Sequence, residues 1–539
     1  MKDKIVDIIK KILSELEYPI INPEIQKPKK NIKADFATNI AFKLSSSLKD
    51  NPLNIASSIK DKMIKSNQFS TVEVAKPGFI NFSFKSDIIL QELNNIIKKD
   101  VEFGKNNIGK NKKVLVEFVS ANPTGPLTVG HGRGAIIGDV ISNIYTWNGY
   151  NVDREYYYNN AGRQMRKLGE STLARYLELC KVEHVFPEDG YKGEYIKEIA
   201  KKIKIEYKES LKNDKNIDFF KAEAEKYIFK EIESTLSNIG IKFNSFFNEN
   251  SLYENNKISE IIDKLKKINL IYKKDGATWF EGTKVGRPAD RVLIKSSGEP
   301  TYRLPDIAYH TTKFDRGYEI CIDVFGADHM DAYPDVLSAI KQLNYKENNV
   351  KVLIHQFISI LKDGKPIKMS TRAANFITLD ELTKEVGKDV LRYFFIMRGM
   401  NSHLNFDLKI AKEKSENNPV YYIQYANARI SNIIDKTSDI NINNNPNLKN
   451  LSLDIELGII NQLIEFEELI IKLIDLNEPQ ILANYLFDLA SLFHKYYAKN
   501  RIITDNLELS SARIVLIKAI QIVLKNGLDI LGISHPDRM

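Results

Sequence analysis

A glycine-rich loop that contains a single histidine has the residue types needed to bind and polarise a phosphate. It lies within VEFVSANPTGPLTVGHGRGAIIGD, residues 116–139, and has Gly130, His131 and Gly132 at its centre. An apolar run precedes it and a helical pattern follows, so backbone N–H groups, a helix dipole and an imidazole would meet at one point. Gly130 and Gly132 would let a ligand approach the backbone. A tight turn with a surface histidine is the alternative, and the strand-loop-helix context favours a phosphate site.

A basic segment much later in the chain offers complementary charge. Residues 358–375 read ISILKDGKPIKMSTRAAN, which predicts a strand, a Lys-Asp-Gly-Lys turn and then a basic run from Lys368 to Arg372. When a phosphate of a nucleotide is attacked, negative charge grows on its equatorial oxygens and on the departing group. Preorganised cations and N–H donors stabilise that transition state more than the ground state. For a basic turn taken alone, a solvated surface loop is the alternative.

These segments need a rigid scaffold, and the surrounding sequence predicts a parallel sheet. Residues 114–118 form a short apolar run typical of a strand that is buried on both faces. Residues 152–157 indicate the next strand. The segment between them has apolar residues at helical spacing: Ile136, Val140, Ile144 and Trp147. We therefore predict one βαβ unit that carries the phosphate loop.

The two motifs resemble the two signatures of class I aminoacyl-tRNA synthetases, and most closely those of the arginyl-tRNA synthetases. The family's first signature reads ANPTGPL, then a VGH core, then GRGA, and the basic run is similar to its KMSK[SR] loop. Thr128 stands where the class has the first histidine of His-x-Gly-His, and Thr371 stands at the usual second lysine. A Thr-x-Gly-His core also occurs in related nucleotidylyltransferases, so the tetrapeptide alone indicates the reaction class rather than the substrate.

The resemblance implies an enzyme that uses ATP, with Mg²⁺ bridging its phosphates, to convert L-arginine to arginyl-adenylate. The arginyl group would then move to the terminal adenosine of tRNA(Arg). Catalytic roles are implied for His131, Lys368 and Arg372. The implied ATP-binding positions are Thr128, Gly130, His131, Gly132, Asp328, Lys368, Met369 and Ser370.

Recognition of arginine requires carboxylates that can pair with a planar guanidinium. The resemblance implies an arginine pocket lined by Glu117, Asn122, Tyr302, Asp306 and Asp328. Without the resemblance, helix capping would be the simplest role for Asp306 or Asp328. Asp328, His329 and Asp331 cluster in sequence without an outlying ligand, so we predict no structural metal.

Aromatic and basic residues are interleaved near the C-terminal end, in NPVYYIQYANAR from residue 418 and FHKYY from residue 493. Such residues can stack unpaired bases and hold phosphates. Many of the tyrosines are expected in the core, but both blocks resemble the family's anticodon-binding bundle. Residues 34–39 and 76–81 are similar to the family's N-terminal domain, which implies contact with the tRNA elbow. The implied tRNA-binding residues of the bundle are Tyr421, Tyr425, Arg429 and Tyr497.

The whole chain is predicted to be a multidomain α/β protein. We expect a small N-terminal α+β domain over residues 1–105 and a doubly wound, parallel-sheet, Rossmann-type nucleotide-binding catalytic domain over 106–410. An all-α helical bundle should occupy 411–539. Lys- and Glu-rich sequence from about 165 to 265 predicts a helical insertion in the sheet. We interpret three later β-type segments as the second half of that sheet: 276–280, 291–294 and 320–325.

Composition describes a soluble globular protein, with 43% hydrophobic and 27% charged residues and a net charge of +8. The basic excess permits a polyanionic partner without requiring one. Cys180 and Cys321 are too far apart in sequence to suggest a disulfide framework or a zinc knuckle. Neither a signal peptide nor a membrane-spanning segment is indicated. We therefore expect a cytoplasmic monomer with no membrane partner.

Three alternatives stay open: a synthetase for another amino acid, a nucleotidylyltransferase, and an RNA-binding paralogue without catalytic activity. Acidic pocket residues argue against an apolar substrate, and a helical C-terminal domain has no use in a nucleotidylyltransferase. A silent paralogue would have decayed motifs, and only Thr128 points that way. The block YYYNNAGRQ, residues 156–164, resembles the family's REYYxNDAGRQ, with Asn160 replacing an aspartate whose contact is therefore in question.

Overall fold

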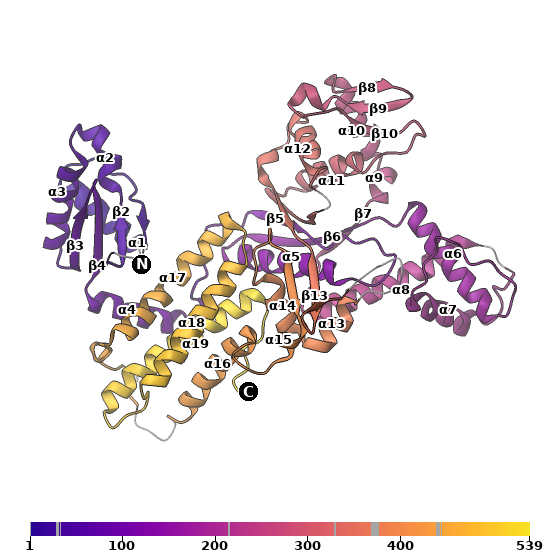
Figure 1. Ribbon diagram of the computed structural model, residues 1–539. Helices are drawn as coiled ribbons and strands as arrows, with labels where there is room; N and C mark the ends of the chain where they lie inside the picture. The colour runs from indigo at the N-terminus through magenta and orange to yellow at the C-terminus, as the bar shows by residue number, and fades with distance from the viewer. Residues whose placement is uncertain are drawn as a thin grey trace.

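The computed structural model consists of a central region built on a parallel sheet, flanked by an N-terminal domain, two excursions from that sheet and a C-terminal helical bundle (Figure 1). It describes the chain with short gaps, and every structural statement below refers to the described residues. These are residues 2–28, 32, 34–213, 216–327, 330–367, 377–437, 442–443 and 445–539.

The central sheet has five parallel strands in the order β12-β11-β5-β6-β7. The chain adds β6 and β7 on one side of β5 and then β11 and β12 on the other, so the strand order reverses beside β5. This confirms the doubly wound fold and places a ligand crevice at the carboxyl ends of β5 and β11. The strands are β5 (Lys113–Glu117), β6 (Asn151–Tyr158), β7 (Ser245–Asn248), β11 (Ile320–Gly326) and β12 (Val350–His355).

Strand β5 and the helix that follows it form the core of this region. Val114, Leu115 and Val116 are buried, as expected for a strand covered on both faces. Helix α5 (Val129–Trp147) begins after the phosphate loop and is buried along nearly its whole length. It packs against α14 (Lys388–Ile396) and against the bundle helices α17 (Asp454–Leu476) and α19 (Leu507–Leu531).

The helical insertion is shorter than the sequence predicts. It contains α6 (Gly162–Leu179), α7 (Glu194–Tyr207) and α8 (Ile217–Asn238). The expected helical segment then contains β7, which pairs with β6 as the edge of the central sheet. Only four residues form this strand, so its β-type pattern is too short to stand out among the Lys- and Glu-rich helices. Helices α9 (Asn250–Glu254) and α10 (Lys257–Lys267) follow it.

The interpretation of the later β-type segments was correct for only one of three. Residues 320–325 lie in β11, but the other two segments form a separate antiparallel sheet in the order β10-β9-β8. This sheet lies above the carboxyl ends of the central strands, together with α10, α11 and α12 (Figure 1). Periodicity identifies strands but not their partners, which accounts for the error. The elements are β8 (Ile271–Lys274), β9 (Ala277–Phe280), β10 (Arg291–Ile294), α11 (Arg303–Asp315) and α12 (Tyr333–Gln342).

After β12, a small mixed sheet supports the second motif. Strand β13 (Ile358–Lys362) pairs with β14 (Lys365–Pro366) in a hairpin and runs parallel to β15 (Leu404–Asp407). The hairpin agrees with the predicted Lys-Asp-Gly-Lys turn. Lys368, Met369, Ser370 and Arg372 themselves lie outside the described residues, as does Asp328. Helices α13 (Leu379–Val386), α14 and α15 (Leu408–Lys412) complete this region.

The N-terminal domain is α+β, as predicted, with an antiparallel sheet in the order β1-β2-β4-β3. Its last helix, α4, packs against α17 and α19 of the bundle, and Lys99 pairs with Glu467 at 2.7 Å. The elements are α1 (Lys2–Glu15), β1 (Ile25–Gln26), β2 (Phe36–Thr38), α2 (Ile40–Leu48), α3 (Pro52–Lys65), β3 (Phe69–Ala75), β4 (Phe79–Phe84) and α4 (Ser86–Lys99).

The C-terminal region is helical, as predicted, and is built from α16 (Pro419–Asp435), α17, α18 (Gln480–Lys499) and α19. Arg392 joins it to the catalytic region: this fully buried guanidinium donates to the Asp139 carboxylate of α5 and to the carbonyls of Ile239 and Leu531. Among the described helices, none combines the length and apolarity needed to cross a bilayer.

Candidate active site

The first turn of α5 presents His131 with a defined hydrogen-bonding pattern. Thr128 is the N-cap, in extended conformation, and its backbone N–H donates to His131 Nδ1 at 3.1 Å. Because Nδ1 accepts, the proton of a neutral ring is on Nε2, which can then donate to a ligand. The first N–H groups of a helix have no acceptor within the helix. This end of α5 therefore has the donors and the dipole expected of a phosphate site.

The two glycines of the loop differ in their surroundings. A Cβ on Gly130 would be 3.6 Å from its nearest neighbour, Thr128 Oγ1, and Gly130 is exposed. A Cβ on Gly132 would be 2.4 Å from Leu379 Cδ1. The expected room for a ligand therefore exists at Gly130, whereas the space beside Gly132 is filled by the packing of α13 on α5.

The chain that leaves the second motif returns to the phosphate loop. Thr378 forms a β-bridge with Thr128, and the Leu379 N–H donates to the Leu127 carbonyl at 2.9 Å. Thr378 is six positions after Arg372, the last basic residue of the second motif. Thr378 and Leu379, which follow the second motif in the chain, are thus hydrogen-bonded directly to the loop that carries His131.

Glu117, at the carboxyl end of β5, belongs to a buried charge network. Its carboxylate accepts from Lys313 Nζ at 2.7 Å and from Ser120 Oγ at 3.0 Å. Lys313 is fully buried and also pairs with Asp323 of β11 at 2.6 Å. Burial raises the pKa of Glu117 despite the attraction of Lys313. At Asp323 the effect of burial is outweighed by Lys313 and His310, which hold the pKa of this carboxyl well below its usual range. Glu117 was predicted to line the arginine pocket, but both carboxylate oxygens are already paired.

His310 links this network to Asp306 on the same helix. Its Nδ1 lies 2.7 Å from the Asp306 carbonyl oxygen and its Nε2 lies 2.9 Å from an Asp323 carboxylate oxygen. Both partners are acceptors, so each ring nitrogen can bond its partner only as an N–H donor. His310 was not singled out from sequence, because its partners are set by the packing of α11 on β11.

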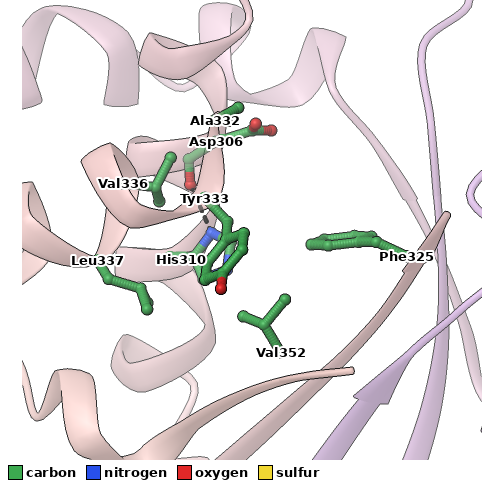
Figure 2. Close-up of a pocket in the computed structure, with 8 residues that line it drawn as sticks. All are labelled: Asp306, His310, Phe325, Ala332, Tyr333, Val336, Leu337 and Val352. Carbon is green, nitrogen blue, oxygen red and sulfur yellow. Dashed lines mark hydrogen bonds between the residues drawn. The ribbon is translucent and has the colours of Figure 1, made fainter. Parts of the chain in front are cut away.

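Asp306 lies in a pocket between α11, α12 and the ends of β11 and β12. The remaining walls of the pocket are formed by His310, Phe325, Ala332, Tyr333, Val336, Leu337 and Val352. The Asp306 carboxylate points away from the His310 ring, while its backbone oxygen faces that ring (Figure 2). Burial, reinforced by Glu117 and Glu249 and opposed by His310, raises the pKa of Asp306 to about 7. No described residue donates a hydrogen bond to this carboxylate, so a cationic partner is lacking.

Glu249 is a second acidic group at this edge, and sequence reasoning missed it. It follows β7 directly and accepts hydrogen bonds from Tyr157 Oη and Asn159 Nδ2, both at 2.7 Å. Burial raises its pKa, and burial followed by the charges of Asp306 and Glu249 raises the pKa of Tyr157. The two carboxylates therefore act on the same phenol. The carboxyl end of a parallel strand was the available signal, but β7 itself was not predicted.

The structure places two other predicted pocket residues outside the cavity wall. Asn122 is exposed; its Oδ1 accepts from the Asn159 backbone N–H at 3.1 Å and its Nδ2 donates to Gln164. Tyr302 is 86% exposed at the start of α11, one helical turn before Asp306. Asn122 thus ties the phosphate loop to the segment after β6, whereas the Tyr302 side chain faces solvent.

The substitution at Asn160 has a local explanation. Its Nδ2 donates to Glu225 Oε1 of α8 at 2.8 Å. An aspartate at this position would place two carboxylates against each other, which is unfavourable. The Asn160 amide, unlike an aspartate, can donate a hydrogen bond to Glu225 of the helical insertion.

The four aromatic and basic residues predicted to contact tRNA come together between α16 and α18. Tyr421 and Tyr425 stack with ring centroids 5.9 Å apart. The Arg429 guanidinium lies over the Tyr425 ring at 4.4 Å and over the Tyr497 ring at 4.9 Å. His494 supports Arg429 through Nδ1 at 3.3 Å. Tyr497 is 38% exposed, so part of its ring can be reached from solvent.

Comparison with known proteins adds independent evidence. Three family models match: the arginyl tRNA synthetase N terminal domain over residues 1–84, the catalytic domain of class I (R) tRNA synthetases over 92–401, and the DALR anticodon binding domain over 423–539. An arginine–tRNA ligase of Desulfotalea psychrophila is 47% identical over 521 residues, covering 96% of this chain and 94% of the relative. One of Salinibacter ruber is 43% identical with full coverage of both chains. The arginyl-tRNA synthetase structure of Thermus thermophilus, 20% identical, has the same fold, with a TM-score of 0.77 and full coverage of both chains. Together with the site geometry, these matches show that the chain belongs to the arginyl-tRNA synthetase family.

Proposed function

We propose that this chain carries out the reaction of its family at the carboxyl edge of the central sheet. L-Arginine and ATP form arginyl-adenylate and pyrophosphate, and the arginyl group then moves to the terminal adenosine of tRNA(Arg) with release of AMP. One observation supports arginine above other substrates: Asp306 and Glu249 are two acidic groups with raised pKa values, and no described cation pairs with the Asp306 carboxylate.

The first half-reaction needs donors where charge develops on ATP. We assign Gly130 and His131 to the ATP phosphates, because the α5 N-terminus and the Nε2–H of His131 supply N–H donors there. Thr128 orients the imidazole through its backbone N–H. Lys368 and Arg372 are proposed as the cations opposite, supported by the bridge between Thr378 and Thr128. Mg²⁺ bound together with ATP would supply further positive charge at the phosphates.

The guanidinium is assigned to Asp306, and the charge of Glu249 adds negative potential at that carboxylate. A planar, bidentate cation satisfies a carboxylate that a small ammonium group would satisfy less well, which favours arginine over lysine. Glu117, although paired with Lys313, also contributes negative potential at Asp306.

The decisive experiment is aminoacylation of unfractionated tRNA with each of the twenty amino acids in turn. Arginine alone should be incorporated, and charging should require ATP. Incorporation of a different amino acid, or nucleotide transfer to a small substrate without tRNA, would exclude the assignment.

The aromatic cluster of α16 and α18 is proposed to stack an unpaired base of the tRNA. Replacing Tyr497 by alanine removes an exposed ring and leaves the buried Tyr496 in place. Loss of one base-stacking ring corresponds to about a tenfold rise in the Kd for tRNA(Arg). Filter binding measures this, and an unchanged Kd would place the anticodon elsewhere.

A further inference from the structure

Three arginines share one buried carboxylate beside the arginine pocket. Asp335, in the first turn of α12, is 2% exposed and accepts a hydrogen bond from the Nε of each. The Nε to carboxylate distances are 2.9 Å for Arg287, 3.3 Å for Arg291 and 2.9 Å for Arg303. The three side chains, termed the arginine cluster, come from the loop before β10, from β10 itself and from the start of α11.

The arginine cluster carries more positive charge than Asp335 neutralises. Three guanidinium groups against one carboxylate leave a surplus of two positive charges, and Arg287 and Arg303 outweigh burial to lower the pKa of Asp335. Every contact uses Nε, so the two terminal nitrogens of each arginine point elsewhere. Across the residues that the structure describes, none of these terminal nitrogens has a hydrogen-bond acceptor. The side chains are 24–36% exposed, so the unused donors can reach a ligand from solvent.

The position of the cluster relates it to the reaction. Tyr333, Val336 and Leu337 of α12 line the pocket, while Asp335 lies between them in sequence and holds the cluster. A surplus of positive charge there opposes the entry of a cationic amino acid into the same pocket. A bound anion would remove that opposition.

Guanidinium groups with free terminal nitrogens match the oxygens of a phosphate in bidentate geometry. Two reactants supply phosphates: ATP, assigned above to the N-terminus of α5, and the tRNA, whose 3′ end must reach the arginyl group at the pocket. We propose that the arginine cluster binds a phosphodiester near the 3′ end of the tRNA. This proposal rests on the proposed placement of arginine beside Asp306. It implies that the 3′ end of the tRNA passes the arginine cluster on its way to the pocket.

The test compares full-length wild type with Arg287→Gln and Arg291→Gln, each of which leaves two arginines on Asp335. Lys274→Gln, an exposed cation on β8 of the same unit, is the charge-matched control. The probes are a tRNA(Arg) transcript and the same transcript without its last four nucleotides, and Kd is measured over a range of salt concentrations. With intact tRNA, each arginine variant should bind about fivefold more weakly, and the slope of log Kd against log salt should fall by about one. The truncated transcript should bind wild type and variants equally.

Binding is measured without charging, so the outcome does not depend on whether arginine is the amino acid used. Equal affinity of wild type and both variants for intact tRNA would make the cluster purely structural. An equal loss with the truncated transcript would move the contact away from the 3′ end. A raised KM for ATP with unchanged tRNA binding would assign the site to the nucleotide. Each of these results overturns the proposal. Thermal denaturation checks that the variants fold. If Arg287→Gln does not fold, the test uses Arg291→Gln, because Arg291 has the longest of the three contacts with Asp335.

Discussion

Replacement of Asp306 by asparagine should have opposite effects on activity and stability. The asparagine keeps the shape of the side chain but removes the charge that the guanidinium requires. A charge-assisted pair in a half-buried site contributes about 3–4 kcal/mol, which corresponds to a 10²- to 10³-fold loss in kcat/KM for arginine. The loss should appear with arginine as the varied substrate, while the KM for ATP stays near the wild-type value.

The free enzyme should become more stable. The pKa of Asp306 rises from an ordinary 3.8 to about 7, and each tenfold change in a dissociation constant is worth about 1.4 kcal/mol, so ionisation costs the folded state at most about 4 kcal/mol. Because the side chain is partly exposed, a gain of about 1–2 kcal/mol is a reasonable expectation. A carboxyl with a raised folded pKa destabilises progressively between its unfolded and folded values. The stability gained by the asparagine should therefore grow from pH 4 to pH 7 and stay constant above pH 7.

The assay combines aminoacylation kinetics with thermal denaturation at pH 5 and pH 8. Asp315→Asn is the control, because Asp315 lies on the same helix but pairs with Lys257 at the surface. It should change neither kcat/KM for arginine nor the pH dependence of stability. A wild-type value of kcat/KM in the Asp306→Asn variant would refute the assignment of the pocket. If the stability gained by the variant over wild type were smaller at pH 8 than at pH 5, the electrostatic reasoning would be refuted.

Four further substitutions test the neighbouring parts of the site. His131→Ala should lower kcat for ATP–pyrophosphate exchange by about 10²- to 10³-fold, because a donor to developing charge is lost, while arginine binding measured by calorimetry stays unchanged. Lys313→Met should reduce the free energy of unfolding by about 3–5 kcal/mol in denaturant titrations, because it leaves two buried carboxylates without their cation; a change below 1 kcal/mol would contradict the network. Gly132→Ala should cost about 1–3 kcal/mol of stability, since its Cβ would lie 2.4 Å from Leu379. Gly130→Ala, with its nearest neighbour at 3.6 Å, should keep wild-type stability, and equal melting temperatures for the two alanine variants would contradict this packing.

Local periodicity predicted the elements that carry the phosphate loop. The apolar run of β5 and the helical spacing of α5 are short-range patterns, and the structure confirms both. The same periodicity did not reveal β7. It also led to the wrong prediction that β9 and β10 belong to the central sheet, whereas they form a separate sheet with β8. Strand pairing is decided between segments far apart in the chain, and a period of two residues is the same whichever strand lies alongside.

The residues of the candidate site also differ in how far the sequence alone could predict their surroundings. The glycine-histidine motif indicated His131 as a binding group, whereas Asp306 was assigned only through the family resemblance. The structure adds the hydrogen bond from Thr128 to His131 and the burial that raises the pKa of Asp306. Glu117 was also indicated, but its partner Lys313 lies 196 positions away in sequence.

The sequence by itself determined the class of chemistry, because a glycine-histidine loop, a basic run and interleaved aromatic residues retain their chemical character in any fold. Only the tertiary structure decided which charges remain available to ligands. Packing of α11 on the central sheet pairs Glu117 with Lys313, while no described cation forms an ion pair with the Asp306 carboxylate. Packing of α12 gathers three arginines around Asp335. Charge is local to a residue, whereas its neutralisation depends on neighbours that only the fold brings near.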